Sequence, residues 1–218
     1  MAELRTEEEQ LEAIKSWWKD NGKSLVIMIA IAISAVYGYK GWQNKQVTNS
    51  ESASLMYQQL ITATVSNTQS DTEKNFATSK HLAKTLKADY ADTQYAKFAA
   101  LLMAKVAVNN QDLNLAEQEL DWVLGKDPQP LVKAIAQMRK AQILNEKSEY
   151  SEALSLLSTI SVESLKGQVS ELEGDIFLAQ GDKEKARAAY QQALTINAAS
   201  NDKAVITMKL NDLTTEEG

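Results

Sequence analysis

Residues 174–193 read GDIFLAQGDKEKARAAYQQA, and the spacing of small and aromatic side chains in this stretch is the strongest structural feature of the 218-residue chain. The pattern small, aromatic, small, aromatic, small falls on Gly174, Phe177, Ala186, Tyr190 and Ala193. Small residues at such positions let two helices approach closely. Gly181-Asp182 supplies a turn between them, and the Asp182 carboxylate can accept hydrogen bonds from the first turn of the second helix. The stretch therefore predicts a helical hairpin.

The same spacing occurs twice more upstream. Ala116, Ala153 and Ala186 lie 37 and 33 residues apart, near the period of about 34 residues of tetratricopeptide repeats. The matching positions are Ala104, Ala107, Ala116, Leu120 and Val123 in one unit and Ala141, Leu144, Ala153, Leu157 and Ile160 in the next. Ser148 is the expected cap of a second helix. We predict an all-α, tetratricopeptide-like solenoid over residues 51–213, with an unrelated helical bundle as the alternative.

Both ends of this solenoid depart from the pattern. Helices are expected at 51–66 and 72–88, and their poor fit is typical of a terminal unit without a neighbour on one side. A helix at 202–213 would cover the last hairpin through the apolar residues Val205, Met208, Leu210 and Leu213. Residues 214–218 are expected to form a free tail.

Residues 25–42 read LVIMIAIAISAVYGYKGW and contain one charge, Lys40. As a helix they extend roughly 27 Å, close to the hydrocarbon thickness of a bilayer. This predicts a single transmembrane helix in the lipid bilayer, against a buried core helix as the alternative. A cleaved signal peptide fits less well, because only five apolar residues precede the possible cleavage site Ala30-Ile31-Ala32.

Residues 1–24 are predicted to be a cytoplasmic tail with a short amphipathic helix. Thr6 and Glu9 have the spacing of a capping box, and Asn21-Gly22 is the expected stop. Lys15, Lys19 and Lys23 precede the span, whereas Lys40 and Lys45 lie at its end and beyond it, and this bias favours a cytoplasmic amino terminus. Residues 43–50 are polar and are either a linker or an extension of the spanning helix.

No residue pattern in the chain indicates chemistry. The net charge is −6 and no basic stripe is present, so nucleic-acid binding is not expected. Cysteine is absent, and the single histidine, His81, lies beside lysines in a helical segment. Glu171 and Asp175 share a helix face, which is more typical of a solvated surface than of paired catalytic carboxylates. We expect no catalytic residue, no metal site and no cofactor.

A solenoid of this kind presents a groove formed by the first helix of each hairpin. The predicted protein-binding groove consists of Phe98, Leu101, Lys105, Val108, Ile135, Met138, Gln142, Asn145, Gln168, Glu171 and Asp175. Its apolar end would receive segments of other proteins. The alternative is that Phe98, Leu101 and Met138 belong to the core.

The order of these features resembles the YfgM family. The resemblance rests on QLEAIK at residues 10–15, the pair Trp17-Trp18, the apolar span, SASLMYQ at residues 52–58 and GDKEKAR at residues 181–187. It covers nearly the whole chain and is strongest at the two ends.

This resemblance implies an ancillary subunit of the bacterial SecYEG translocon that is not an enzyme. It implies an inner-membrane anchor at residues 25–42, a cytoplasmic amino terminus and a periplasmic carboxy-terminal domain. The implied partners are the translocon, a PpiD-like periplasmic chaperone and secretory protein clients. A scaffold for another envelope assembly is the alternative function, and an envelope enzyme is a more remote one.

Overall fold

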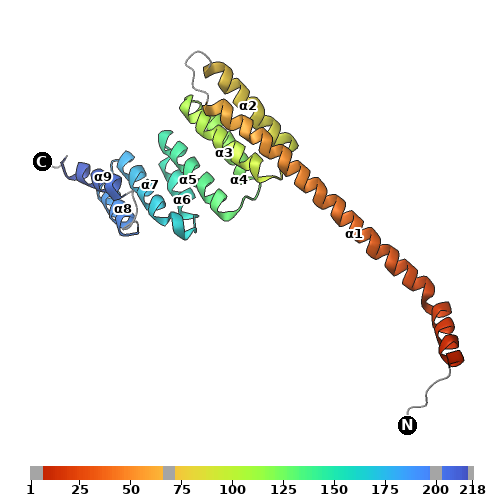
Figure 1. Ribbon diagram of the computed structural model, residues 1–218. Coiled ribbons are helices and arrows are strands. Elements are labelled where there is room, and N and C mark those ends of the chain that lie inside the picture. The colour runs from red at the N-terminus through yellow and green to blue at the C-terminus, as the bar shows by residue number, and fades with distance from the viewer. Residues whose placement is uncertain (1–6, 66–71, 197–202, 216–218) are drawn as a thin grey trace, which may run out of the picture. The chain divides into compact units, whose positions relative to one another are not determined.

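A computed structural model describes residues 7–65, 72–196 and 203–215. Every regular element within these ranges is a helix (Figure 1), which confirms the predicted all-α class. The chain forms two compact units, Met1–Ser52 and Ala53–Gly218.

The first unit contains most of helix α1 (Glu7–Val65). This helix passes through Asn21 and Gly22, so the predicted stop there is wrong. Gly22 keeps a negative φ, and its Cα faces the Trp18 indole, whose atoms lie 3.1 Å from where a Cβ would be. Residues 43–50 are helical as well. The expected cap at Thr6 lies outside the described residues.

The apolar part of α1 is exposed in this unit. Among the described residues, α1 is the one helix long and apolar enough to cross a membrane, with a mean hydropathy of 1.6 in a window that is 6% buried. The Ser34 hydroxyl donates to the Ala30 carbonyl at 2.8 Å, so this polar group is satisfied within the helix. Its exposure distinguishes the segment from a buried core helix.

The second unit begins with the last turns of α1, helix α2 (Thr72–Asp89) and helix α3 (Gln94–Asn109). Their shared core contains Ala53, Leu60, Ala83, Leu86, Ala99 and Met103. Alternating small and large apolar side chains let the three helices pack closely. Helix α2 agrees with the predicted 72–88 to within one residue. The helix expected at 51–66 is the last part of α1, which is continuous from Glu7, so the separate helix predicted there is wrong.

Three helical hairpins follow the predicted repeat. They pair α3 with α4 (Leu113–Leu124), α5 (Pro130–Glu146) with α6 (Tyr150–Ser158), and α7 (Lys166–Ala179) with α8 (Lys183–Ile196). A short 3-10 helix, η1 (Glu163–Leu165), precedes α7. Each hairpin buries the small residue at the predicted position, which is Ala116, Ala153 or Ala186.

The turn inside each hairpin repeats with the same period. Gln111, Ser148 and Gly181 have φ values of 62°, 63° and 81°, and the amide of the next residue donates to a carbonyl of the first helix at 2.8–2.9 Å. This is the hydrogen bonding of a helix that ends in a left-handed residue. The predicted cap at Ser148 is therefore wrong, because Ser148 is the left-handed residue and Glu149 occupies the cap position. The cap at Asp182 is confirmed by its bond from the Lys185 amide at 3.1 Å.

Helix α9 (Lys203–Thr215) covers the last hairpin, as expected. Ile206 and Leu213 are buried in one cluster with Ala186, Tyr190 and Ala193. The predicted contacts of Leu210 and Leu213 are confirmed. Val205 and Met208 are exposed instead, and the buried residue in the first turns of the helix is Ile206. The expected free tail begins inside the described helix, which extends to Thr215.

Candidate protein-binding groove

The predicted groove residues come from the first helices of the three hairpins, α3, α5 and α7. Side chains open to solvent are Phe98, Lys105, Val108, Gln142 and Gln168, and half-buried ones are Ile135, Met138, Asn145, Glu171 and Asp175. Leu101 is 8% exposed and lies in the core between α3, α4 and α5. The Asn145 side-chain oxygen is buried.

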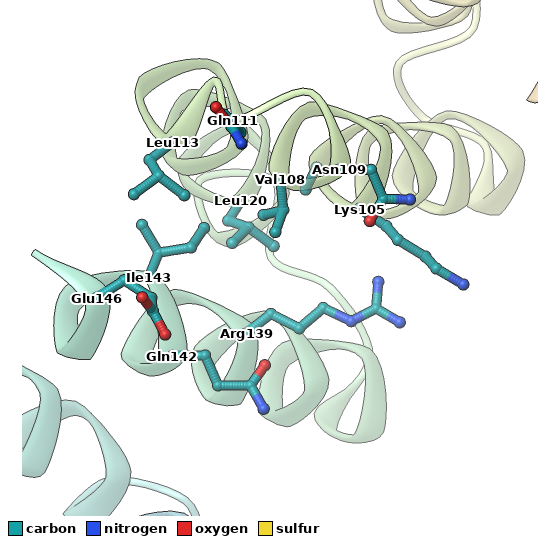
Figure 2. A pocket seen from close by; sticks show the side chains of 11 residues that line it. Lys105, Val108, Asn109, Gln111, Leu113, Leu120, Arg139, Gln142, Ile143 and Glu146 are labelled. Atoms are coloured by element: carbon teal, nitrogen blue, oxygen red, sulfur yellow. The ribbon is translucent and has the colours of Figure 1, made fainter. Parts of the chain in front are cut away.

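A cavity of about 600 Å³ lies between α3, α4 and α5, and it brings three of these residues together (Figure 2). Lys105 and Val108 line it from α3, and Gln142 lines it from α5. Its remaining lining residues are Ala104, Asn109, Gln111, Leu113, Leu120, Arg139, Ile143 and Glu146. This size is in the range of ligand pockets, and it can receive a few side chains of another polypeptide.

Arg139 is one of the cavity residues that the sequence-based prediction missed. It is half-buried, and its Nη1 donates to the Leu101 carbonyl at 3.0 Å. Burial lowers the pKa of Arg139, and the residue acting against this effect is Tyr57. Because a guanidinium is far more basic than any group that titrates near neutrality, Arg139 stays charged at neutral pH.

The missed signal in α5 is a stripe of residues one position away from the predicted face. Arg139, Gln142, Ile143 and Glu146 are spaced at i, i+3, i+4 and i+7 and all line the cavity. Such residues lie on one side of a helix. The predicted face used Met138 and Asn145, which do not line the cavity, and Met138 packs against the core of the next hairpin instead.

An aromatic cluster lies close to the beginning of this groove. The Tyr57 ring from α1 lies 5.9 Å from the Tyr95 ring and 6.3 Å from the Phe98 ring, measured between centroids. Burial raises the pKa of Tyr57, so its hydroxyl is neutral. Phe98 is 36% exposed and offers an apolar surface to a partner.

Helix α9 occupies the other end of the predicted groove. Lys209 Nζ lies 2.8 Å from Glu171 and 2.7 Å from Asp175, and 5.6 Å from the Tyr190 ring centroid. The Tyr190 hydroxyl donates to Asp175 at 2.7 Å. Burial lowers the pKa of Lys209, but the hydrogen bonds and charges of Asp175 and Glu171 outweigh it and raise the pKa. These acidic residues are therefore held by α9.

The described residues contain no group of three or more histidine, aspartate or glutamate side chains that could hold a metal ion. The His81 side chain is exposed on α2 and donates no hydrogen bond to another described residue, and the His81 backbone carbonyl accepts from the Thr85 hydroxyl. The arrangement offers surfaces for binding.

Comparison with known proteins gives a consistent result over nearly the full length. A family model for a tetratricopeptide repeat-like domain matches residues 15–215. A protein of Aggregatibacter actinomycetemcomitans is 32% identical over 98% of this chain and 100% of its own length. One from Escherichia coli is 30% identical over 95% of this chain and 96% of its own. Both are named ancillary SecYEG translocon subunit, as is a Haemophilus influenzae protein at 29% identity over 98% of this chain and 100% of its own.

Among solved structures, MamA from Desulfovibrio magneticus RS-1, residues 41 to the end, has a TM-score of 0.52. It is 16% identical, and the match covers 77% of this chain and 88% of that one. At this identity the likeness shows the helical repeat fold alone.

Proposed function

The chain belongs to the YfgM family of proteins with a tetratricopeptide repeat-like domain, and from this membership we propose that it is a non-enzymatic ancillary subunit of the SecYEG translocon. The observation that carries the proposal is the likeness to relatives of that name along nearly the whole chain, from the candidate span to the last repeat.

The candidate membrane span supports an association with the membrane that contains the translocon. We propose that residues 25–42 anchor the chain in the inner membrane, with residues 1–24 in the cytoplasm and residues 51–213 in the periplasm. A reporter enzyme that is active only outside the cytoplasm, fused after Gly218, tests this orientation. Activity there supports the proposed topology, and inactivity of a fusion that is stably produced contradicts it.

The groove supports a role in holding other polypeptides. We propose that its open part, from Phe98 to Gln142, holds segments of emerging secretory proteins and passes them to a PpiD-like periplasmic chaperone. Phe98 is an exposed apolar side chain, and Val108 is another that lines the cavity. Exposed apolar side chains of this kind are typical of surfaces that bind peptide segments.

Co-purification from gently solubilised membranes tests the central part of the proposal. The tagged full chain should recover the translocon subunits in near-stoichiometric amount. A matched control carries an unrelated apolar helix of the same length in place of residues 25–42, which separates a contact made by the span from one made by the domain. Recovery of a different envelope assembly, with no translocon, would favour the scaffold function instead.

A further inference from the structure

The cavity between α3, α4 and α5 has different charges at its two ends. Lys105 and Arg139 extend toward one end, whereas Glu146 lies at the other (Figure 2). The wall between these ends is apolar and includes Val108, Leu113, Leu120 and Ile143. A segment bound here would therefore meet positive charge and apolar surface side by side.

Arg139 differs from the lysines that lie between the helices. Lys87 pairs with Glu119, Lys140 with Asp121, and Lys147 with Glu117. Arg139 has no carboxylate within ion-pair distance in the part of the chain that the structure describes, and its guanidinium donates to the Leu101 carbonyl. A half-buried guanidinium without a counter-charge is unfavourable, so a bound carboxylate would remove a penalty as well as add hydrogen bonds.

The guanidinium group favours a particular partner. Its remaining N–H groups form a planar fork that matches the two oxygens of a carboxylate, and bonds of this kind are stronger than neutral ones. Lys105 is exposed and can add a second positive charge at the same end. The Glu146 side chain disfavours a second acidic group at the far end.

We propose that the Lys105 and Arg139 end of the cavity binds a carboxylate of a partner polypeptide, while a neighbouring apolar side chain of that segment covers Val108, Leu120 and Ile143. The carboxylate can belong to an acidic side chain or to a chain terminus. This inference rests on the proposed function, because it specifies which segments the groove selects among clients and chaperones.

Fluorescence anisotropy with the purified full chain in detergent tests the selection. Three eight-residue peptides of leucine, alanine and glycine serve as probes. The first has a central Leu-Glu pair and an amidated terminus, the second has Leu-Gln in that place, and the third has Leu-Gln with a free carboxyl terminus. We expect the first or the third to bind about tenfold more tightly than the second, as for one charge-assisted bond pair, and the stronger of the two identifies the source of the carboxylate.

Arg139→Gln should remove this preference, and Lys105→Gln should reduce it about threefold, as for an exposed charge. Lys133→Gln is the matched control, since it removes one exposed positive charge from α5 outside the cavity lining. If Arg139→Gln alters folding, Lys105→Gln still tests the proposal, because Lys105 is exposed and its substitution should leave the fold intact.

Equal binding of all three peptides, unchanged by both variants, would overturn the carboxylate preference and leave peptide binding by the groove intact. Absence of binding by every peptide would overturn it as well. The co-purification experiment is independent of these results, so failure of this inference is distinguishable from failure of the proposed function.

Discussion

The first and last hairpins use equivalent repeat positions for opposite purposes. The corresponding residues are Ala104, Lys105 and Leu120 in the first hairpin and Gly174, Asp175 and Tyr190 in the last. In the last hairpin, Tyr190 is fully buried against Gly174, and Asp175 pairs with Lys209 of α9. In the first hairpin, Lys105 is exposed and lines the open cavity.

The same repeat pattern can therefore form either a groove end that another helix covers or a groove end that stays open. Small residues in the first helix fix how closely the second helix packs, and this is common to both hairpins. The charge at the next position then decides whether the terminal helix is held there. We infer that the last hairpin stabilises the end of the solenoid and that the first provides its binding surface.

Of the substitutions that test this comparison, Tyr190→Ala should reduce the free energy of unfolding most. It removes a fully buried aromatic ring and leaves a cavity, at a cost of about 3–5 kcal/mol in free energy of unfolding. Denaturant unfolding measures the loss, and hydrogen exchange should locate it in α7, α8 and α9. Gln192→Ala, on the exposed side of α8, is the control and should change stability by less than about 0.5 kcal/mol. Equal loss of protection in α3 and α4 would mean that the two ends do not unfold separately.

Gly174→Ala should destabilise the last hairpin by about 1–3 kcal/mol, as overpacking does. A Cβ there would lie 2.4 Å from Tyr190 Cε1, and the ring is held by its hydroxyl bond to Asp175. Adding Tyr190→Leu should recover part of this cost, because alanine and leucine occupy the same two positions in the other hairpins. Simple additivity of the two changes in a double-mutant cycle would contradict this account.

Gly125→Ala is the matched control for that substitution. Its Cβ would lie 3.4 Å from the nearest atom, the Asp121 carbonyl oxygen, and its backbone is right-handed. We expect a change in the denaturation midpoint that is small beside that of Gly174→Ala.

Lys209→Gln should weaken the attachment of α9 by about 1 kcal/mol, because it removes one cation from two carboxylates in a half-exposed site. Faster hydrogen exchange in α9 is the expected observation. Lys105→Gln is the comparison variant, and its thermal midpoint should not change because Lys105 has no ion pair within the described residues. Equal effects of the two variants would remove the distinction between a closed and an open end.

The smallest effect should be a difference in how stability depends on pH between the α9 end of the solenoid and the contacts of α4. The pKa of Lys209 is raised in the folded protein. Its contribution to the free energy of unfolding is therefore complete below its unfolded pKa of about 10.4, and this contribution is lost as pH rises through the folded pKa. Burial and the bond to Asp175 raise the pKa of Tyr190, which acts in the same direction.

The hydrogen bond from Lys147 holds the pKa of Glu117 below its ordinary value. Its contribution is therefore complete above about pH 4.5 and is lost as pH falls through the folded pKa. Hydrogen exchange at low and high pH should show α9 loosening first in alkali and the contacts of α4 with α5 loosening first in acid. Salt should reduce both effects, and loss of protection in the opposite order would contradict the assignment.

The repeat period predicted the hairpins because it reports helix packing that occurs within about 35 residues. The same period gave the exposed and buried faces of α5 and α9 only in part. Periodicity shows that a helix has an apolar side, but its rotation depends on neighbours in the next unit. The Arg139 guanidinium reaches back to the Leu101 carbonyl, 38 residues earlier, and Ile206 fills space beside Tyr190. The first contact joins two hairpins and the second involves the helix that follows the last hairpin, so neither is specified by the spacing within one repeat.

Photo-crosslinking in intact cells at Val108 tests the central claim most directly. Val108 is 43% exposed and lines the cavity, whereas Leu131 is 50% exposed on α5 outside it and serves as the matched position. Our account predicts that Val108, far more than Leu131, becomes attached to secretory chains, a membrane-anchored chaperone or the translocon. Equal labelling at both positions, or attachment of Val108 only to an unrelated envelope assembly, would contradict it.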